Sequence, residues 1–417
     1  MNILLIKNIK EIIKAETCPS LRLYGKDMSS FQSIKDAYLI IKNEKVAEIG
    51  KMSDIQISKL ANAPDIKEFN AEGRFLFPSF CDSHTHLVYA ESRESEFVDK
   101  IKGLTYEEIA KKGGGILNSA SKVNKASEEY LYDKAFERLE EVKSYGTGAI
   151  EIKSGYGLSV NDELKILRVI KKLKENTDIR IKATFLGAHA IPLDYKDRRN
   201  DYVNLIINRM IPQISAEGLA DYCDVFCEEG FFSNEETEKI INVAVKYGLK
   251  SKIHANQLYN SGGVQIAVKN NSLSADHLET IGDEEIDVLK DAFTMPTLLP
   301  SSSFFLNMHY APARKMIDRG LSIALASDYN PGSSPSGNMQ FVCSLGCIKL
   351  RMTPEEVINA TTTNAAYAME VSKTHGSITV GKPANLFITK KMSSYSFLPY
   401  SFGSNVIEYI ILNGKSQ

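Results

Sequence analysis

The sequence has no tryptophan and only six cysteines among its 417 residues. These cysteines show no spacing typical of a zinc finger or a secreted disulfide scaffold, so we expect buried free thiols in a reducing compartment. Fifty basic side chains stand against 52 acidic ones, and the missing basic excess argues against a nucleic-acid or acidic-membrane partner. No apolar run approaches the roughly 20 residues that span a bilayer, and the apolar start is too short for a signal peptide. We therefore expect a cytoplasmic protein with no membrane or nucleic-acid partner.

The two ends of the chain carry short strand-like runs separated by turn residues. Residues 37–41 and 46–49 flank a polar segment at 43–45, which is typical of a β-hairpin. Similar short runs return near the C-terminus, at 376–380, 384–388 and 406–412. We expect one small β-sandwich domain built from residues 1–75 and 371–417.

Residues 76–370 alternate short apolar runs with helical patterns, which is the signature of βα units around a parallel sheet. Capping boxes mark two helix starts, Ser233 with Glu236 and Thr353 with Glu356. We predict eight strands, at 75–81, 147–153, 181–187, 222–227, 250–254, 273–277, 293–298 and 321–327. Eight such units predict an α/β fold with a TIM-like (β/α)8 barrel as the catalytic part of the chain.

Metal-binding residues cluster where these predicted strands end. His84 and His86 follow the first strand, His254 ends the fifth, and Asp328 follows the eighth. Barrel enzymes place their catalytic groups at the carboxyl ends of the strands. In an extended chain the two histidines point to one side, about 6–7 Å apart, so both can bind one metal ion. His254 and Asp328 would complete the shell and leave a position for water, whereas a polar turn without metal is the plainer alternative.

A metal ion at this place predicts hydrolytic chemistry, because it lowers the pKa of water towards about 7 and polarises a carbonyl. We expect Asp328 to bind the metal with one oxygen and to accept the water proton with the other. His277, at the end of the sixth strand, is expected to stabilise the oxyanion, with a core histidine or a second metal ligand as alternatives. The fourth strand ends without a lysine and Lys153 belongs to another strand, so one metal ion is expected rather than a lysine-bridged pair.

Longer segments carry a more specific resemblance, at residues 82–87, 113–116, 151–158, 184–190, 274–279 and 327–333. From about residue 78 to 335 the chain resembles the imidazolonepropionase family of the metal-dependent amidohydrolase superfamily. The resemblance implies a hydrolase that opens the ring of 4-imidazolone-5-propanoate to N-formimidoyl-L-glutamate, in histidine degradation, by a metal-bound hydroxide. It also implies one zinc or iron ion per subunit, and three histidines with a carboxylate suit both metals.

The resemblance also assigns residues, in two groups. The implied metal ligands are His84, His86, His254 and Asp328, and the implied substrate-binding residues are Arg93, Tyr106, Tyr156, His189, Gln257, Asn330, Gly332 and Ser333. A guanidinium such as Arg93 can hold the propionate by two parallel hydrogen bonds, and tyrosine rings offer flat area to an imidazolone. A solvated loop arginine and core tyrosines are the alternatives. The chain departs from the usual pattern at Ser79, Asn256 and Asn385, where Gly, Asp and Asp are expected.

Two other functions compete with this interpretation. A deaminase or another amidohydrolase acting on a small heterocycle would share the metal shell, and Arg93, Tyr156 and His189 discriminate because they suit an anionic tail on a small ring. A non-catalytic barrel predicts loss of metal ligands, and all four are present. For the assembly we expect a homodimer, because symmetric dimers are the commonest oligomers.

Overall fold

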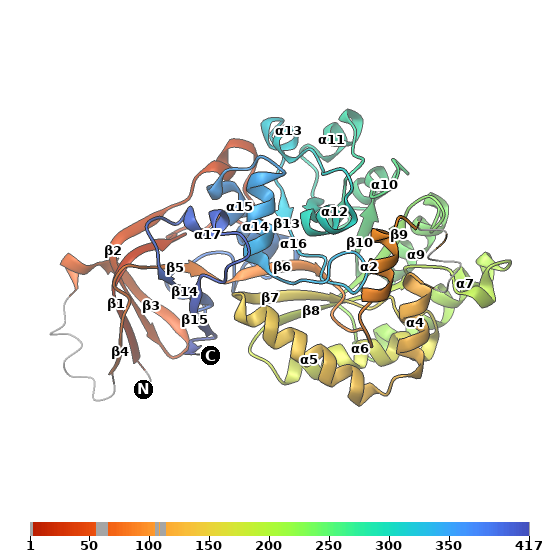
Figure 1. Ribbon diagram of the computed structural model, residues 1–417, viewed down its shortest axis with the longest axis horizontal. Helices are drawn as coiled ribbons and strands as arrows, with labels where there is room; N and C mark the ends of the chain where they lie inside the picture. Colours follow the sequence, from red (N-terminus) through yellow and green to blue (C-terminus); the bar gives the residue numbers. More distant parts are fainter. Residues whose placement is uncertain (1–2, 56–65, 105–107, 109–113, 417) are drawn as a thin grey trace.

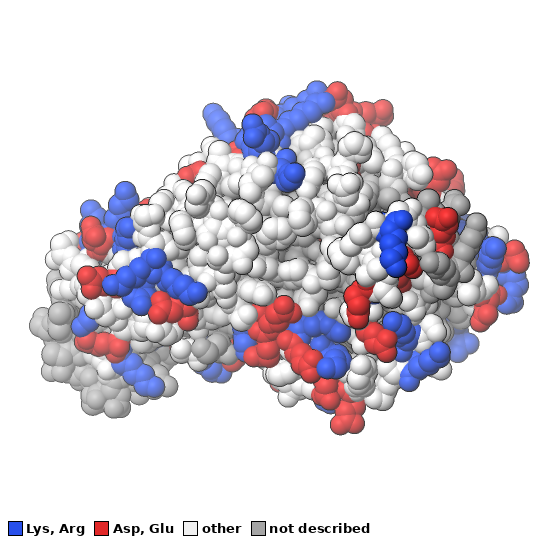
Figure 2. All heavy atoms as spheres, viewed as in Figure 1, with Lys and Arg blue, Asp and Glu red and all other residues white. Residues whose placement is uncertain are grey.

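The computed structural model describes residues 3–55, 66–104, 108 and 114–416, and it contains two large sheets joined side by side (Figure 1). One sheet is built from both ends of the chain and the other from its middle. Within the described residues, no helix combines the length and the apolar composition that crossing a membrane requires. On the face shown in Figure 2, basic and acidic side chains alternate around the periphery and much of the centre is uncharged.

The middle of the chain forms the predicted barrel of eight parallel strands. In hydrogen-bonded order they are β6 (Phe80–Thr85), β7 (Thr147–Lys153), β8 (Arg180–Ala188), β9 (Tyr222–Cys227), β10 (Lys250–Ala255), β11 (Ser274–His277), β12 (Met295–Leu298) and β13 (Ala324–Leu325). The last and first strands meet just beyond β13, where Asp328 N donates to His84 O (3.0 Å) and His86 N donates to Tyr329 O (2.8 Å). The barrel therefore closes at its carboxyl end, through the predicted metal-binding segments themselves.

The prediction of the first barrel strand at 75–81 was wrong. The chain changes sheets at Ser79, whose N–H donates to Asn385 O in one sheet, while Phe80 N donates to Gly146 O in the other. Residues before this point form β5 (Arg74–Pro78) of the terminal sheet, and β6 begins immediately after it. Apolar residues resume directly after Pro78 and Ser79, so hydrophobicity alone did not mark so short a break as the boundary between two strands. As a result His84 lies inside a barrel strand rather than after it.

The terminal sheet interleaves strands from the two chain ends. Its order is β16 (Lys415–Ser416), β15 (Ile407–Leu412), β14 (Leu386–Lys391), β5, β1 (Ile3–Ile13), β2 (Ser33–Lys42) and β3 (Lys45–Lys51), with β4 (Ile66–Asn70) paired to β1. The predicted hairpin is confirmed as β2 and β3, and Asn43 and Glu44 between them both have positive φ, as a type I′ turn requires. Because β5 pairs with both β1 and β14, we propose Ser79, rather than residue 75, as the boundary between this domain and the barrel.

Aromatic packing fixes the terminal sheet against the barrel. Phe77 and Phe387 stack with ring centroids 5.3 Å apart, and Phe80 at the start of β6 packs on Phe387 at 5.1 Å. Gly146, just before β7, lies so close to Ile407 that an added Cβ would come within 2.5 Å of it. The amino-terminal end of the barrel is therefore seated on an apolar face of the sheet.

The helices pack mainly around the barrel (Figure 1). They are α2 (Glu94–Ile101), α4 (Ile116–Lys125), α5 (Glu128–Ser144), α6 (Val160–Glu175), α7 (Arg199–Leu205), α8 (Ile211–Ala216), α9 (Asn234–Lys246), α10 (Gly263–Lys269), α11 (Asp283–Leu289), α12 (Pro300–Leu306), α13 (Ala313–Asp318), α14 (Met339–Ile348), α15 (Pro354–Thr361), α16 (Thr363–Ala368) and α17 (Phe397–Tyr400). Both predicted capping boxes are present, at the starts of α9 and α15. The cysteines are free thiols and four are buried as predicted, but Cys18 is exposed and Cys347 only partly covered.

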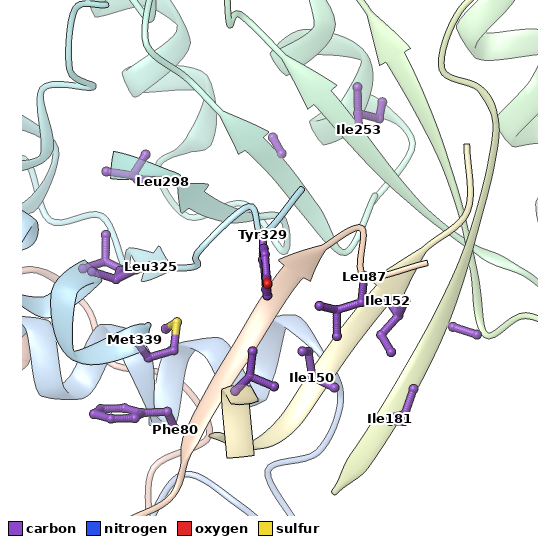
Figure 3. Packing of buried hydrophobic residues seen from close by; sticks show 14 of the residues in the cluster. Phe80, Leu87, Ile150, Ile152, Ile181, Ile253, Leu298, Leu325, Tyr329 and Met339 are labelled. Carbon is purple, nitrogen blue, oxygen red and sulfur yellow. The ribbon is translucent and has the colours of Figure 1, made fainter. Parts of the chain in front are cut away.

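The barrel strands alternate between an apolar outer face and a polar interior. Ile150 and Ile152 of β7 and Ile253 of β10 belong to the buried hydrophobic cluster of Figure 3. The residues between or beside them, Glu151 and Lys252 among others, are charged and fully buried. Buried charges are costly unless they are paired, so the barrel interior has to be organised by ion pairs.

Candidate metal centre and active site

Three histidines converge at the carboxyl end of the barrel. His84 comes from β6, His86 follows it, and His254 comes from β10. One ring nitrogen from each lies within 4.8 Å of the other two, and all three side chains are buried. The His-x-His spacing does bring two imidazoles to the same side of the chain, as the extended geometry of a strand requires.

Asp328 follows β13, the last strand of the barrel, and lies beside His84 of the first strand, β6, and His86 directly after it. Its Oδ1 lies 3.6 Å from His84 Nε2 and 3.7 Å from His86 Nε2. Ligands bonded to zinc at about 2.0–2.1 Å in a tetrahedron lie about 3.3 Å apart, which is close to these separations. The backbone of Asp328 is in the left-handed region, with φ of 54°, and this turn aims the carboxylate back over the strand ends. The structure thus brings together all four residues predicted as metal ligands.

A carboxylate lies behind each of two histidines, hydrogen-bonded to the ring of His84 and in ion-pair contact with that of His254. His84 Nδ1 lies 2.7 Å from Asp276 Oδ2, and His254 Nδ1 lies 2.9 Å from Asp224 Oδ2. His84 Nε2 is buried without a hydrogen-bond partner among the described residues. An imidazole held by a carboxylate on one nitrogen and left unsatisfied on the other is the usual arrangement of a metal ligand. The donor set therefore fits a divalent metal ion.

The protonation states also suit metal binding. Burial, followed by the nearby Lys153 charge, holds the pKa of His84 well below its usual range, and burial with the neighbouring His189 and His254 does the same for His86. Metal ions bind neutral imidazole, so these rings need lose no proton when an ion enters. Burial raises the pKa of Asp328, although the adjacent histidines act in the opposite direction.

His277 lies beside this cluster, at the end of β11. Its ring centroid is 5.2 Å from that of His254 and 5.6 Å from that of His84. His277 Nδ1 lies 3.5 Å from Glu279 Oε2. Burial would lower the pKa of His277, but the carboxylates of Glu279 and Asp328 outweigh it and raise the pKa overall. A histidine with this bias towards protonation can donate a hydrogen bond to a developing negative charge.

His189 and Tyr156 form one wall next to His86. His189 stacks on His86 with ring centroids 5.3 Å apart, and Tyr156 lies 5.4 Å from His189. Burial lowers the pKa of His189 to about 3, so its ring is neutral. Its Nδ1 lies 3.0 Å from Gly155 O; a carbonyl only accepts, so Nδ1 carries the hydrogen and Nε2 is a hydrogen-bond acceptor.

Arg93 and Gly332 meet next to this wall, where the Arg93 guanidinium interacts with Tyr156. The Arg93 side chain is only 8% exposed and its Nη1 lies 3.7 Å from Glu96 Oε2. A Cβ added to Gly332 would lie 1.7 Å from Arg93 Nη2, so the guanidinium lies directly against this glycine. Lys100 Nζ from α2 donates to Gly332 O at 3.2 Å. Two cationic side chains therefore share this part of the site.

The turn after β13 uses its polar groups internally. Asn330 Oδ1 accepts from both Gly332 N and Ser333 N at 2.8 Å, and Asn330 Nδ2 donates to Asp328 O. Ser333 Oγ donates to Asp328 Oδ2 at 3.1 Å. The backbone N–H groups of Gly332 and Ser333 are thus bonded to Asn330, and the turn positions the carboxylate of Asp328. Direct substrate contact by Asn330 and Ser333 stays a prediction.

The remaining predicted positions have different outcomes. Tyr106 and the start of segment 113–116 lie outside the described residues. Gln257 is buried and its N–H donates to Glu228 Oε2. Asn256 donates to Asn260. His254 Nδ1 contacts Asp224, so the asparagine at position 256, where aspartate is expected, does not alter the contact between His254 and its carboxylate. Sequence reasoning missed Asp224 and Asp276; the available signal was a charge inside an otherwise apolar strand.

Comparisons with known proteins agree with this geometry. The model of the amidohydrolase family matches residues 75–416. Curated imidazolonepropionases from Flavobacterium johnsoniae and Christiangramia forsetii are 56% and 52% identical, each alignment covering 99% of both chains. The relative from Thermoanaerobacter pseudethanolicus is 42% identical over 98% of this chain and 96% of its own.

Solved structures share the fold at much lower identity. A triazine hydrolase variant superposes with a TM-score of 0.76 at 15% identity, covering 99% of this chain and 94% of its own. A zinc-bound adenosine deaminase from Xanthomonas campestris has a TM-score of 0.70 at 15% identity, covering 99% and 92%. The curated relatives are similar at far higher identity and over nearly full length, and the chain belongs to the imidazolonepropionase family of amidohydrolases.

Proposed function

We propose that this protein is the hydrolase that opens the ring of 4-imidazolone-5-propanoate to N-formimidoyl-L-glutamate in histidine degradation. The observation that carries the proposal is the meeting of three buried histidines with Asp328, beside the Arg93 guanidinium and Tyr156, in a chain 56% identical to a curated imidazolonepropionase. The proposed reaction adds one water across the ring C–N bond beside the carbonyl. The ring opens and no fragment leaves.

His84, His86, His254 and Asp328 would hold one divalent zinc or iron ion. When bound, such an ion supplies Lewis acidity, which lowers the pKa of water and polarises a carbonyl. Both metals suit three imidazoles and a carboxylate, so the choice between them is decided by metal analysis of the purified protein.

The side chains around the centre have separate proposed roles. Asp328 takes a proton from the attacking water and passes it to the departing ring nitrogen, and Ser333 Oγ fixes its Oδ2 for this task. His277 donates to the oxygen of the substrate carbonyl as negative charge develops there. His189 Nε2 accepts a hydrogen bond from a ring N–H, which orients the ring over Tyr156.

Arg93 binds the propionate group of the substrate, with Lys100 adding positive charge at the same side. Two parallel hydrogen bonds from a guanidinium fix a carboxylate in both position and orientation. The distance between this cation pair and the histidine cluster then determines which ring atoms reach the metal centre. A substrate without the anionic tail would lose this placement, which is why a deaminase of an uncharged heterocycle fits less well.

The decisive experiment is a direct assay with 4-imidazolone-5-propanoate. Activity should be present in the purified protein, disappear on chelation and return with zinc or ferrous iron, in proportion to the metal content of the same sample. Full activity after complete metal removal would refute the metal centre. Turnover of an aminated heterocycle in place of the imidazolone would favour the deaminase alternative.

We also propose that the enzyme works as a cytoplasmic homodimer. Symmetric dimers are the commonest assembly, and the free thiols fit a reducing compartment. Light scattering on a sizing column measures the assembly directly, and a monomeric mass would refute it.

A further inference from the structure

A layer of five charged side chains lies inside the barrel beneath the histidine cluster. Its members come from four strands of the barrel, β7, β9, β10 and β11, and are Glu151, Lys153, Asp224, Lys252 and Asp276. All five are completely buried. A structural role alone does not require charges here, because apolar side chains of similar volume fill barrel interiors at lower cost.

Lys153 occupies the centre of this layer. Its Nζ lies 2.6 Å from Glu151 Oε1, 2.8 Å from Asp224 Oδ2 and 3.6 Å from Asp276 Oδ2. The two aspartate oxygens that it contacts are the same atoms that contact the histidines. Asp224 Oδ2 lies 2.9 Å from His254 Nδ1, and Asp276 Oδ2 lies 2.7 Å from His84 Nδ1.

The Lys153 ammonium group and the His254 ring therefore contact the same oxygen of Asp224. The ammonium group and the His84 ring likewise contact the same oxygen of Asp276. Asp276 Oδ1 has no hydrogen-bond partner within the described residues, so the orientation of this carboxylate depends on what its Oδ2 contacts. Asp224 is held more firmly, because its Oδ1 also accepts from His254 N and Val225 N.

We propose that Lys153 is a positioning residue for the metal centre: it fixes the carboxylates of Asp224 and Asp276 and, through them, the rings of His84 and His254. This inference rests on the proposed metal centre. A carboxylate that fixes a ligand imidazole raises metal affinity only while its own orientation is fixed, and the loss of such an outer contact typically weakens metal binding about 10- to 100-fold.

Lys252 provides a matched control within the same layer. It is equally buried and contacts Glu151 Oε2, while its Nζ also donates to Ser83 O at 3.2 Å. Within the described residues it forms no ion pair with either of the two aspartates behind the histidines. Replacing either lysine by methionine removes the same charge from the same layer, but only one of the two changes acts on the histidine-bound carboxylates.

The experiment measures metal binding without substrate. Apoprotein of the wild type, Lys153→Met and Lys252→Met is titrated with Zn²⁺ in competition with a chelating dye. We expect the zinc Kd to rise about 10- to 100-fold in Lys153→Met and to change by less than about threefold in Lys252→Met. Both variants should lower the apoprotein Tm, because each leaves a buried carboxylate without one of its cations. The visible spectrum of the Co²⁺-loaded protein, which reports ligand geometry, should change in Lys153→Met only.

A second variant covers the case in which Lys153→Met does not fold. Lys153→Met combined with Glu151→Gln removes one charge of each sign, which preserves the balance of the layer while still releasing both aspartates. Wild-type zinc affinity in either Lys153 variant, or an equal loss in Lys252→Met, would overturn the proposal. If neither Lys153 variant folds while Lys252→Met does, Lys153 serves barrel stability instead. A wild type that binds neither zinc nor ferrous iron would refute the metal centre itself, a result distinct from all of these.

Discussion

Replacing Gly332 by alanine should loosen the hold on the substrate carboxylate while leaving the metal centre intact. The new Cβ would lie 1.7 Å from Arg93 Nη2, whereas ordinary contacts between heavy atoms are about 3.5 Å. The guanidinium must therefore retreat by about 1.5–2 Å. Hydrogen bonds need donor–acceptor distances of about 2.7–3.2 Å, so a retreat of this size breaks its bonds to a bound propionate.

The size of the effect follows from the kind of bond that is lost. A hydrogen bond to a charged group contributes about 1.5–3 kcal/mol, and every 1.4 kcal/mol corresponds to about tenfold in affinity. The KM for 4-imidazolone-5-propanoate should rise about 10- to 150-fold. The turnover of saturated enzyme should change much less, because the residues that move protons are untouched. Metal content should stay at the wild-type level.

Two competitive probes separate this explanation from a general disturbance. Imidazole-4-propanoate carries the carboxylate and 4-ethylimidazole lacks it, so only the first should lose inhibition in Gly332→Ala. Gly282→Ala, at the start of α11, makes the same substitution against the flexible end of Glu285 and should leave both probes unaffected. A KM within twofold of wild type, or an equal loss for the two probes, would refute the contact between Arg93 and the substrate.

Three further outcomes test other parts of the site and fold. Asp328→Asn should cut turnover by orders of magnitude, because the amide cannot carry the proton; near-full activity with metal retained would contradict this role. Arg93→Ala should mainly raise KM, and an unchanged KM would refute the proposal that Arg93 binds the propionate group of the substrate. Burial lowers the pKa of His375 to about 4, so below about pH 6.5 the unfolded chain binds a proton that the folded state excludes. The free energy of unfolding should therefore fall as the pH drops, by about 2 kcal/mol from this residue between pH 7 and pH 5. Urea titrations should show that His375→Gln removes this part of the pH dependence, and an unchanged difference between the two pH values would count against it.

The sequence predicted that His84, His86, His254 and Asp328 would lie together, because strand ends in a barrel converge and because His84 and His86 are spaced for one side of an extended chain. It failed at residues 75–81, where apolar residues on both sides of Pro78 and Ser79 serve two different sheets and the chain passes from one sheet to the other at Ser79. It could not identify Asp224, Asp276 or Lys153 as parts of the centre, since periodicity shows that a buried strand carries charge but not which charges meet across the barrel. The need for glycine at position 332 likewise depends on where Arg93 lies, a contact between residues far apart in the chain.

The barrel closes where the segment after β13 joins β6, and the same junction brings Asp328 to the histidines. The complete set of proposed metal ligands therefore exists only in a closed barrel. During synthesis His84 and His86 leave the ribosome long before Asp328, and the hydrogen bonds that join their segments form only once the last strand has docked. A nascent or truncated chain therefore lacks both this junction and the proposed carboxylate ligand. An ion that binds only the completed site therefore stabilises finished molecules relative to partially folded ones by mass action.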